Sequence, residues 1–210
     1  MIPADGSVRR RLVAAARRLA ALGLNRGKSG NVSARVKDGF VITPSGKNYE
    51  ALAARDLVMV KGEPRGGQKP SSEWRLHRDI YARRPEAGAI VHTHSPYATT
   101  LACLRRPIPA IHYEIAFAGG DNIRCAPYAT FGTQKLSDHA LAALEGRSAC
   151  LLANHGVVVF AAGIEQAVVL AQKVEELART YWQAIQVGDP VILDAAEMAR
   201  VVKKFKTYGR

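Results

Sequence analysis

Apolar residues recur every three or four positions in several parts of the chain, which is typical of helices that bury one face. The two longest stretches of this kind cover residues 7–22 and 164–185. Shorter helices are expected at residues 71–83, 96–104, 133–144 and in a short segment after Asp194. The helical pattern is therefore spread along the whole chain in separated blocks.

Short apolar runs between these blocks predict strands. They lie at residues 32–36, 39–43, 57–60, 89–94, 150–153 and 157–160. Turn residues separate neighbouring runs, as at Pro44-Ser45-Gly46, and residues 61–70 form a loop rich in glycine, lysine and proline. Because helices and strands interleave, we expect one α/β domain in which helices cover a sheet.

The length of 210 residues suffices for one well-buried core, so a single domain is the default expectation. No run of about eighteen apolar residues is present, so no membrane-spanning helix is expected. The basic N-terminal residues are not followed by the apolar segment of a secretory signal. Cys103, Cys125 and Cys150 have no CxxC spacing and are expected to be reduced thiols. A cytoplasmic location without membrane contact is therefore expected.

The formal charge of +12 arises from 30 lysines and arginines against 18 acidic residues. These basic residues are dispersed, and no motif that reads DNA or RNA accompanies them. We therefore expect mainly solvated basic faces and no nucleic-acid partner. Electrostatic steering of a small anionic substrate stays open as a second explanation, and nucleic-acid binding is the least supported of the three.

Three histidines stand at the ends of apolar runs. His92 and His94 are one residue apart, so an extended strand would direct both imidazoles to the same face. His155 follows another apolar run and precedes a glycine. Three imidazoles with an open fourth position are typical of a catalytic metal site, so the chain is expected to be a divalent-metal enzyme. His77 and His139 are expected to be ordinary core or surface residues.

A second group of candidate residues surrounds Glu73. Ser71 and Ser72 precede it at a predicted helix start, where hydroxyls and free backbone N–H groups favour an anion such as phosphate. Glycines in the loop 27–31 and in the turn Ser45-Gly46 would let backbone amides approach the same anion. A carboxylate between an anion site and a metal is placed as a general base, although Glu73 also fits the simpler role of a helix-dipole partner.

Several motifs together resemble the class II aldolase/adducin family. They are GNVS (30–33), ITPSG (42–46), PSSEW (70–74), HTH (92–94), IPAIHY (108–113), APYATFGT (126–133) and the tail KFKTYG (204–209). The likeness extends from about Leu12 to Gly209, and it is greatest to the aldolases of ketose 1-phosphates such as L-fuculose 1-phosphate.

The resemblance implies a single domain over residues 1–210, with a central, mostly antiparallel sheet covered by helices on both faces. It implies a homotetramer whose tail, residues 204–210, reaches a neighbouring subunit. One Zn²⁺ per subunit would be held by His92, His94 and His155, with Glu73 as a further ligand when substrate is absent.

The remaining site residues follow from the same resemblance. The substrate phosphate would contact Gly30, Asn31, Ser45, Gly46, Ser71 and Ser72. Phe131 would line the aldehyde side, while Tyr113 and Tyr208 would come from a neighbouring subunit. Lys28 departs from the family pattern, which has a small hydroxyl residue at this point of the phosphate loop.

The implied reaction is reversible cleavage of a ketose 1-phosphate to dihydroxyacetone phosphate and a small aldehyde such as lactaldehyde, through a metal-stabilised enediolate. Glu73 would act as the base and Tyr113 as the proton donor. Pentulose-phosphate 4-epimerases resemble this chain but have Asp where Glu73 stands. Dehydratases of methylthio-pentulose phosphates share both the histidines and the glutamate, so they remain an alternative. A binding module of the adducin type would be expected to lack the three histidines.

Overall fold

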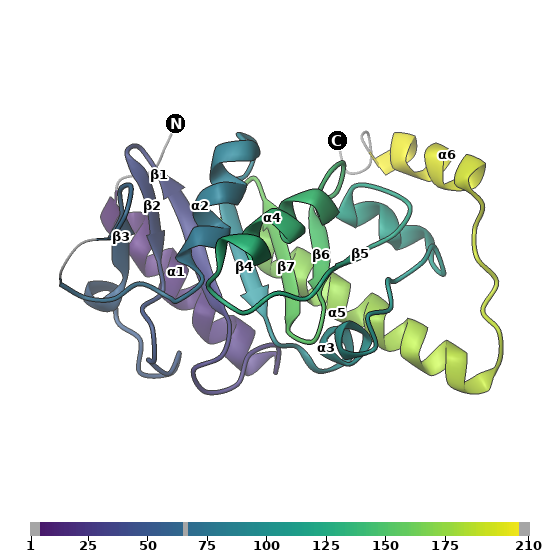
Figure 1. Ribbon diagram of the computed structural model, residues 1–210, viewed down its shortest axis with the longest axis horizontal. Helices are drawn as coiled ribbons and strands as arrows, with labels where there is room; N and C mark the ends of the chain where they lie inside the picture. Colours follow the sequence, from purple (N-terminus) through teal and green to yellow (C-terminus); the bar gives the residue numbers. More distant parts are fainter. Residues whose placement is uncertain (1–4, 65–66, 206–210) are drawn as a thin grey trace.

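The computed structural model describes residues 5–64 and 67–205, and a seven-stranded sheet forms its centre (Figure 1). The strands are β1 (Asn31–Val36), β2 (Gly39–Ile42), β3 (Val58–Val60), β4 (Ala89–Thr93), β5 (Arg124–Ala126), β6 (Ala149–Leu152) and β7 (Gly156–Ala161). Their order is β3-β2-β1-β4-β7-β6-β5, and of these pairs β5–β6 is parallel while the others are antiparallel. The expected α/β fold with a mostly antiparallel sheet is confirmed.

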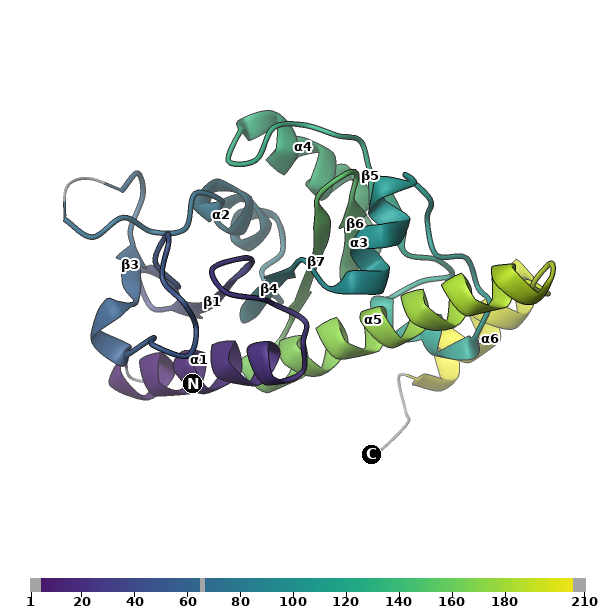
Figure 2. The same cartoon turned by 90° about the horizontal axis from the view of Figure 1, so that it is seen from below.

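Helices cover both faces of this sheet (Figure 2). They are α1 (Asp5–Ala21), α2 (Trp74–Arg83), α3 (Pro96–Cys103), α4 (Gln134–Ala143), α5 (Ile164–Val187) and α6 (Ala195–Phe205). Helices α1 and α5 lie along one face, with α3 packed on α5, and α2 and α4 cover the opposite face. Helix α6 packs on the short 3-10 helix η2 (Tyr113–Ala118). No helix in the described part of the chain is long and apolar enough to cross a membrane.

Each strand divides its side chains between two cores, because successive residues point to opposite faces. In β4, Ala89 and Val91 belong to the core under α1 and α5, whereas Ile90 belongs to the core under α2 and α4. His92 has the same parity as Ile90 and therefore faces the α2 side. The alternation within β4 thus places the first predicted metal ligand.

Three local features differ from the sequence expectations. Strand β5 was not expected, since its three residues show no apolar alternation, and it exists through parallel pairing with β6. Helix α2 begins at Trp74 rather than at Ser71, because the Trp74 N–H bonds the Ser71 carbonyl oxygen in a preceding turn. At the other end, residues 204 and 205 are the last turn of α6, and residues 206–210 lie outside the described part of the chain.

Candidate active site

The end of β4 positions two imidazoles side by side. His92 is fully buried, and its Nδ1 lies 2.9 Å from the carbonyl oxygen of Val157 on the neighbouring strand. That nitrogen therefore donates its proton to the carbonyl and leaves Nε2 toward the site. His94 is the first residue after the strand, and its Nε2 lies 3.0 Å from Nε2 of His92. Asn25 fixes this strand end by accepting the His94 backbone N–H on Oδ1 at 3.2 Å.

His155 completes the cluster from the turn between β6 and β7. Its ring centroid lies 4.8 Å from that of His92 and 5.0 Å from that of His94. The next residue must be small, since a Cβ at Gly156 would lie 2.4 Å from the Thr93 carbonyl oxygen and 3.0 Å from the His94 ring. One nitrogen from each of the three histidines lies within 4.8 Å of the others, so the predicted ligands are brought together.

The donor set fits a divalent metal ion. Burial, together with the positive charge of His92, lowers the pKa of His94 and of His155 to about 4, so both rings are neutral at pH 7 and have a lone pair to offer. Tetrahedral bonds of about 2.0–2.1 Å to zinc would bring such nitrogens to roughly 3.3 Å from one another, close to the 3.0 Å between Nε2 of His92 and Nε2 of His94. Three imidazoles leave a coordination position open for substrate.

Glu73 lies beside this cluster at the start of α2. Its side chain is buried, and Oε2 accepts hydrogen bonds from Nδ2 of Asn31 at 3.1 Å and from Nε2 of His92 at 2.9 Å. Oε1 accepts no hydrogen bond from the described residues and lies 3.4 Å from Nε2 of His155. Burial alone raises the pKa of Glu73, but the charge and hydrogen bond of His92, with His155 and Asn31, lower that pKa well below its ordinary range. Glu73 is therefore ionised at neutral pH, with Oε2 held by two hydrogen bonds and Oε1 without a hydrogen-bond donor among the described residues.

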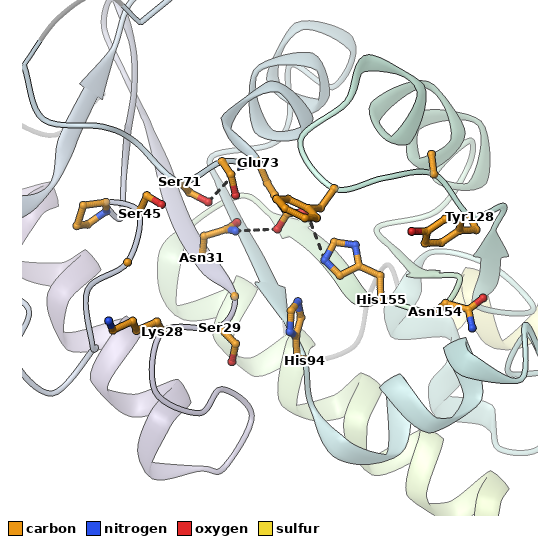
Figure 3. Close-up of a pocket in the computed structure, with 16 residues that line it drawn as sticks. Lys28, Ser29, Asn31, Ser45, Ser71, Glu73, His94, Tyr128, Asn154 and His155 are labelled. Carbon is orange, nitrogen blue, oxygen red and sulfur yellow. Dashed lines mark hydrogen bonds and ion pairs between the residues drawn. The ribbon is translucent and has the colours of Figure 1, made fainter.

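A cavity of about 290 Å³ opens beside Glu73 (Figure 3). The predicted residues that line it are Lys28, Gly30, Asn31, Ser45, Gly46, Ser71, Ser72, Glu73, His94, Phe131 and His155. Figure 3 shows Lys28 and Ser45 at one end and Tyr128 and Asn154 at the other, with Glu73 and His155 between them. The cavity thus has a cationic and hydroxyl-rich end, a central acid–imidazole group, and an aromatic end with the ring of Tyr128.

The loop at the cationic end depends on Gly30. Its φ of 72° lies in the left-handed region. A Cβ there would come within 2.5 Å of the His92 carbonyl oxygen and 2.4 Å of Oδ1 of Asn25. Glycine therefore lets the loop that carries Lys28 approach the end of β4.

Not every predicted residue lines the cavity. His92 and Tyr113 are not among the lining residues. The ring of Tyr113, which is 51% exposed, has its centroid 4.6 Å from that of His112 and 6.2 Å from that of Phe205. Tyr208 lies outside the described residues. The phosphate contacts, the neighbouring-subunit roles of Tyr113 and Tyr208, and the catalytic roles of the lining residues stay predictions.

The structure adds residues that the sequence did not single out. Asn25 bonds the strand end, and Tyr128 and Asn154 line the aromatic end of the cavity. Asn154 has a φ of 54°, which is uncommon for a residue with a side chain, and its Oδ1 accepts a hydrogen bond from Nε of Arg105 at 3.0 Å. The signal in the sequence was their position in or beside the predicted motifs. Asn25 comes shortly before the glycine loop, Tyr128 lies within the motif APYATFGT, and Asn154 precedes His155.

Comparison with known proteins identifies a family. The family model described as "Class II Aldolase and Adducin N-terminal domain" matches residues 10–182. The chain is 56% identical over 205 residues to the 5-methylthioribulose-1-phosphate/5-deoxyribulose-1-phosphate aldolase of Rhodospirillum rubrum, which covers 97% of this chain and 93% of that protein. It is 50% identical over 191 residues to the L-fuculose phosphate aldolase of Escherichia coli O6:H1, covering 90% and 89% of the two chains.

Solved structures agree with this result. A structure of L-fuculose 1-phosphate aldolase matches with a TM-score of 0.92 and 39% identity over 98% of each chain. The structure of YgbL from Klebsiella pneumoniae, described as a putative aldolase/epimerase/decarboxylase, matches with a TM-score of 0.86 and 30% identity, covering 95% of this chain and 99% of that one.

Proposed function

This chain belongs to the class II aldolase and adducin family and is a metal-dependent aldehyde-lyase, and on that premise we propose that it is a zinc aldolase of deoxyketose 1-phosphates. The reaction is reversible cleavage of the C3–C4 bond to give dihydroxyacetone phosphate and a small aldehyde. One observation carries the proposal: a buried carboxylate, Glu73, lies between a three-histidine cluster and a cavity whose far end carries Lys28 and hydroxyl groups.

The phosphate of the substrate is assigned to the cationic end of the cavity. Lys28 supplies a positive charge there, and Ser45, Ser71 and Ser72 supply hydroxyl groups. Gly30 and Gly46 expose backbone without a side chain in the same lining. This arrangement supports an anion at that end, as proposed for the phosphate, and directs the carbon chain toward Glu73.

Zinc held by His92, His94 and His155, one ion per subunit, would act as a Lewis acid that stabilises negative charge on the substrate oxygens. In the direction of synthesis, Glu73 removes a proton from the hydroxymethyl carbon of dihydroxyacetone phosphate. Oε1 is the oxygen suited to this, because Oε2 is already bonded to Asn31. The resulting carbon nucleophile adds to the aldehyde, and the new alkoxide takes a proton from Tyr113 of a neighbouring subunit.

The aldehyde is assigned to the aromatic end of the cavity. Tyr128 at that end and Phe131 in the same lining are 52% and 64% exposed, and apolar ring faces favour a substrate that ends in a methyl or methylthio group. The name of one relative, the Rhodospirillum rubrum aldolase, specifies two such substrates, 5-deoxyribulose 1-phosphate and 5-methylthioribulose 1-phosphate. L-Fuculose 1-phosphate, which yields lactaldehyde, is the second candidate, on the strength of the relatives named for it.

The assembly is proposed to be a homotetramer in the cytoplasm. Tyr113 and Phe117 are exposed on η2 and lie outside the cavity of their own chain. This position suits side chains that complete the site of a neighbour, as proposed for Tyr113 and for the tail residue Tyr208.

To test the proposal, the products formed from three substrates are identified: 5-deoxyribulose 1-phosphate, 5-methylthioribulose 1-phosphate and L-fuculose 1-phosphate. We expect dihydroxyacetone phosphate, measured by coupled reduction with NADH, with turnover greatest for a pentulose phosphate and zinc found at one equivalent by elemental analysis. Loss of water without carbon–carbon cleavage would instead identify a dehydratase, and interconversion of C4 epimers an epimerase. The presence of Glu at position 73, rather than Asp, supports the aldolase over the epimerase.

A further inference from the structure

Asn31, which bonds Glu73, is the first of a row of buried polar side chains, and the proposed mechanism does not use the others. Oδ1 of Asn31 is 2.5 Å from Nε2 of His77, and Nδ1 of His77 is 2.6 Å from Oγ of Ser33. Oγ of Ser33 is in turn 2.8 Å from the hydroxyl of Tyr81. The row therefore connects Tyr81, through Ser33, His77 and Asn31, to the carboxylate of Glu73.

The fold builds this row from two elements. Asn31 and Ser33 alternate along β1 and share the face toward α2. Glu73, His77 and Tyr81 are spaced by four residues, so they share the helix face toward β1. His77 is completely buried, as is the side chain of Ser33, so water does not compete for these hydrogen bonds.

The carboxylate of Glu73, at one end of the row, determines the direction of each hydrogen bond in it. A carboxylate can only accept, so Asn31 must present its NH₂ group to Glu73 and its carbonyl oxygen to His77. That oxygen can only accept, so His77 carries its proton on Nε2. Burial lowers the pKa of His77 to about 3, so the ring is neutral and Nδ1 must accept from the hydroxyl of Ser33. Ser33 then accepts from the hydroxyl of Tyr81.

We infer that His77 is a positioning residue, which locks the carboxamide of Asn31 in the one orientation that holds Oε2 of Glu73 and leaves Oε1 directed to the substrate. The inference rests on the proposed role of Glu73 as the base. A reversed carboxamide would turn its carbonyl oxygen toward the carboxylate, and two acceptors at 3.1 Å repel each other. Nε2–H of His77 excludes that orientation, because the NH₂ group would then face another donor.

The role of His77 matters most when His92 binds a metal. His92 Nε2 is at once the nitrogen nearest His94 and a hydrogen-bond donor to Glu73 in the metal-free protein. A nitrogen that binds a metal ion through its lone pair no longer donates a proton. Asn31 is then the remaining described donor to Oε2, and His77 controls its orientation.

The first test reads the ring of His77 directly. ¹⁵N NMR of zinc-loaded protein with labelled histidine, with the His77 signals assigned from their loss in H77Q, should show a protonated Nε2 and an unprotonated Nδ1 at every pH from 5.5 to 8. A proton on Nδ1, or a doubly protonated ring within that range, would overturn the inference. Because this measurement needs no substrate, it decides the inference even if the aldolase assay fails.

The second test compares His77→Leu, His77→Gln and Ile80→Ala. Leucine removes the donor to Asn31, whereas the amide nitrogen of glutamine can replace Nε2–H. Ile80 is a fully buried residue on the same helix outside the row, so Ile80→Ala is the matched packing control. The readouts are kcat, KM, zinc content, the thermal midpoint, and solvent hydrogen exchange into dihydroxyacetone phosphate.

We expect His77→Leu to lower kcat and hydrogen exchange by about 10- to 100-fold, with KM and zinc content little changed. His77→Gln should recover most of this loss, and Ile80→Ala should lower the thermal midpoint without a comparable loss of exchange. Equal losses in H77L and H77Q, or an equal loss in I80A at the same zinc content, would mean a purely structural role and would refute the inference. Should H77L fail to fold, H77Q and the NMR measurement still decide.

Discussion

Strand β1 buries different kinds of side chain on the two faces of the sheet. On the α1/α5 face it contributes the apolar residues Val32, Ala34 and Val36 to the core. On the α2/α4 face the same strand contributes Asn31 and Ser33, which are buried as deeply but are polar. One strand with ordinary alternation thus supports two environments.

The difference indicates that the buried polar residues serve the site, whereas the apolar core serves folding stability. Burying a polar group costs free energy unless it is hydrogen-bonded, and Asn31, Ser33 and His77 all have partners. Such a network contributes less net stability than apolar packing of the same volume. We therefore expect substitutions of these buried polar residues to affect turnover first, and substitutions of apolar residues in the α1/α5 core to affect folding first.

The largest effect is expected at Glu73 on the polar face. Glu73→Gln keeps the size and the burial of the side chain but cannot accept a proton from carbon. Turnover should fall by about 10²- to 10⁴-fold, while zinc content, measured by elemental analysis, and the thermal midpoint stay close to those of the unchanged protein. Unaltered turnover in this variant would remove Glu73 as the base.

On the apolar face the expected effect is on stability alone. Leu177→Ala removes a buried side chain of α5 that belongs to the core of the α1/α5 face. Urea unfolding should show a loss of about 2–5 kcal/mol in the free energy of unfolding, with kcat unchanged at a temperature where the variant is folded. Val169, on the same helix but 50% exposed, provides the control, because Val169→Ala removes little buried area. A large fall in kcat for Leu177→Ala would contradict the division between the faces.

The smallest expected effect is on the pH dependence of stability, through Asp79 at the contact between α2 and α4. Burial raises the pKa of Asp79, but hydrogen bonds from Arg78, Ser137 and Gln134 lower it more, so the folded-state pKa lies below the ordinary value of 3.8. The carboxylate therefore stabilises the fold above about pH 4, and this contribution disappears as the pH falls through the folded-state pKa.

Asp79→Asn should accordingly lower the free energy of unfolding by about 1 kcal/mol at pH 7. Below pH 4 the difference in this free energy between the variant and the unchanged protein should become smaller, as measured by urea unfolding across pH. Asp38→Asn, at an exposed pair with Lys61, should change stability much less. If the stability difference between Asp79→Asn and the unchanged protein became larger in acid, the downward direction assigned to the pKa of Asp79 would be wrong.

The sequence predicted the long elements and the three clustered histidines because each has a strong local signal. The spacing of His92 and His94 on an apolar run, and the apolar stripe of the helix now seen as α5, needed no tertiary information. Strand β5 could not be predicted, since Arg124-Cys125-Ala126 becomes a strand through pairing with β6. His77 was expected to be an ordinary core residue; it is buried as expected, but its contacts with Asn31 and Ser33 depend on how α2 packs against β1.

His155 is distant in sequence from His92 and His94, and it meets them only once β4 has paired with β7. An unfolded chain therefore offers no comparable cluster, and an ion that binds these rings selects the native conformation by mass action. The free energy of binding is added to that of folding in proportion to the logarithm of the ion concentration. The supply of metal in the cell would then set not only how many molecules are active but how long each one survives unfolding and degradation.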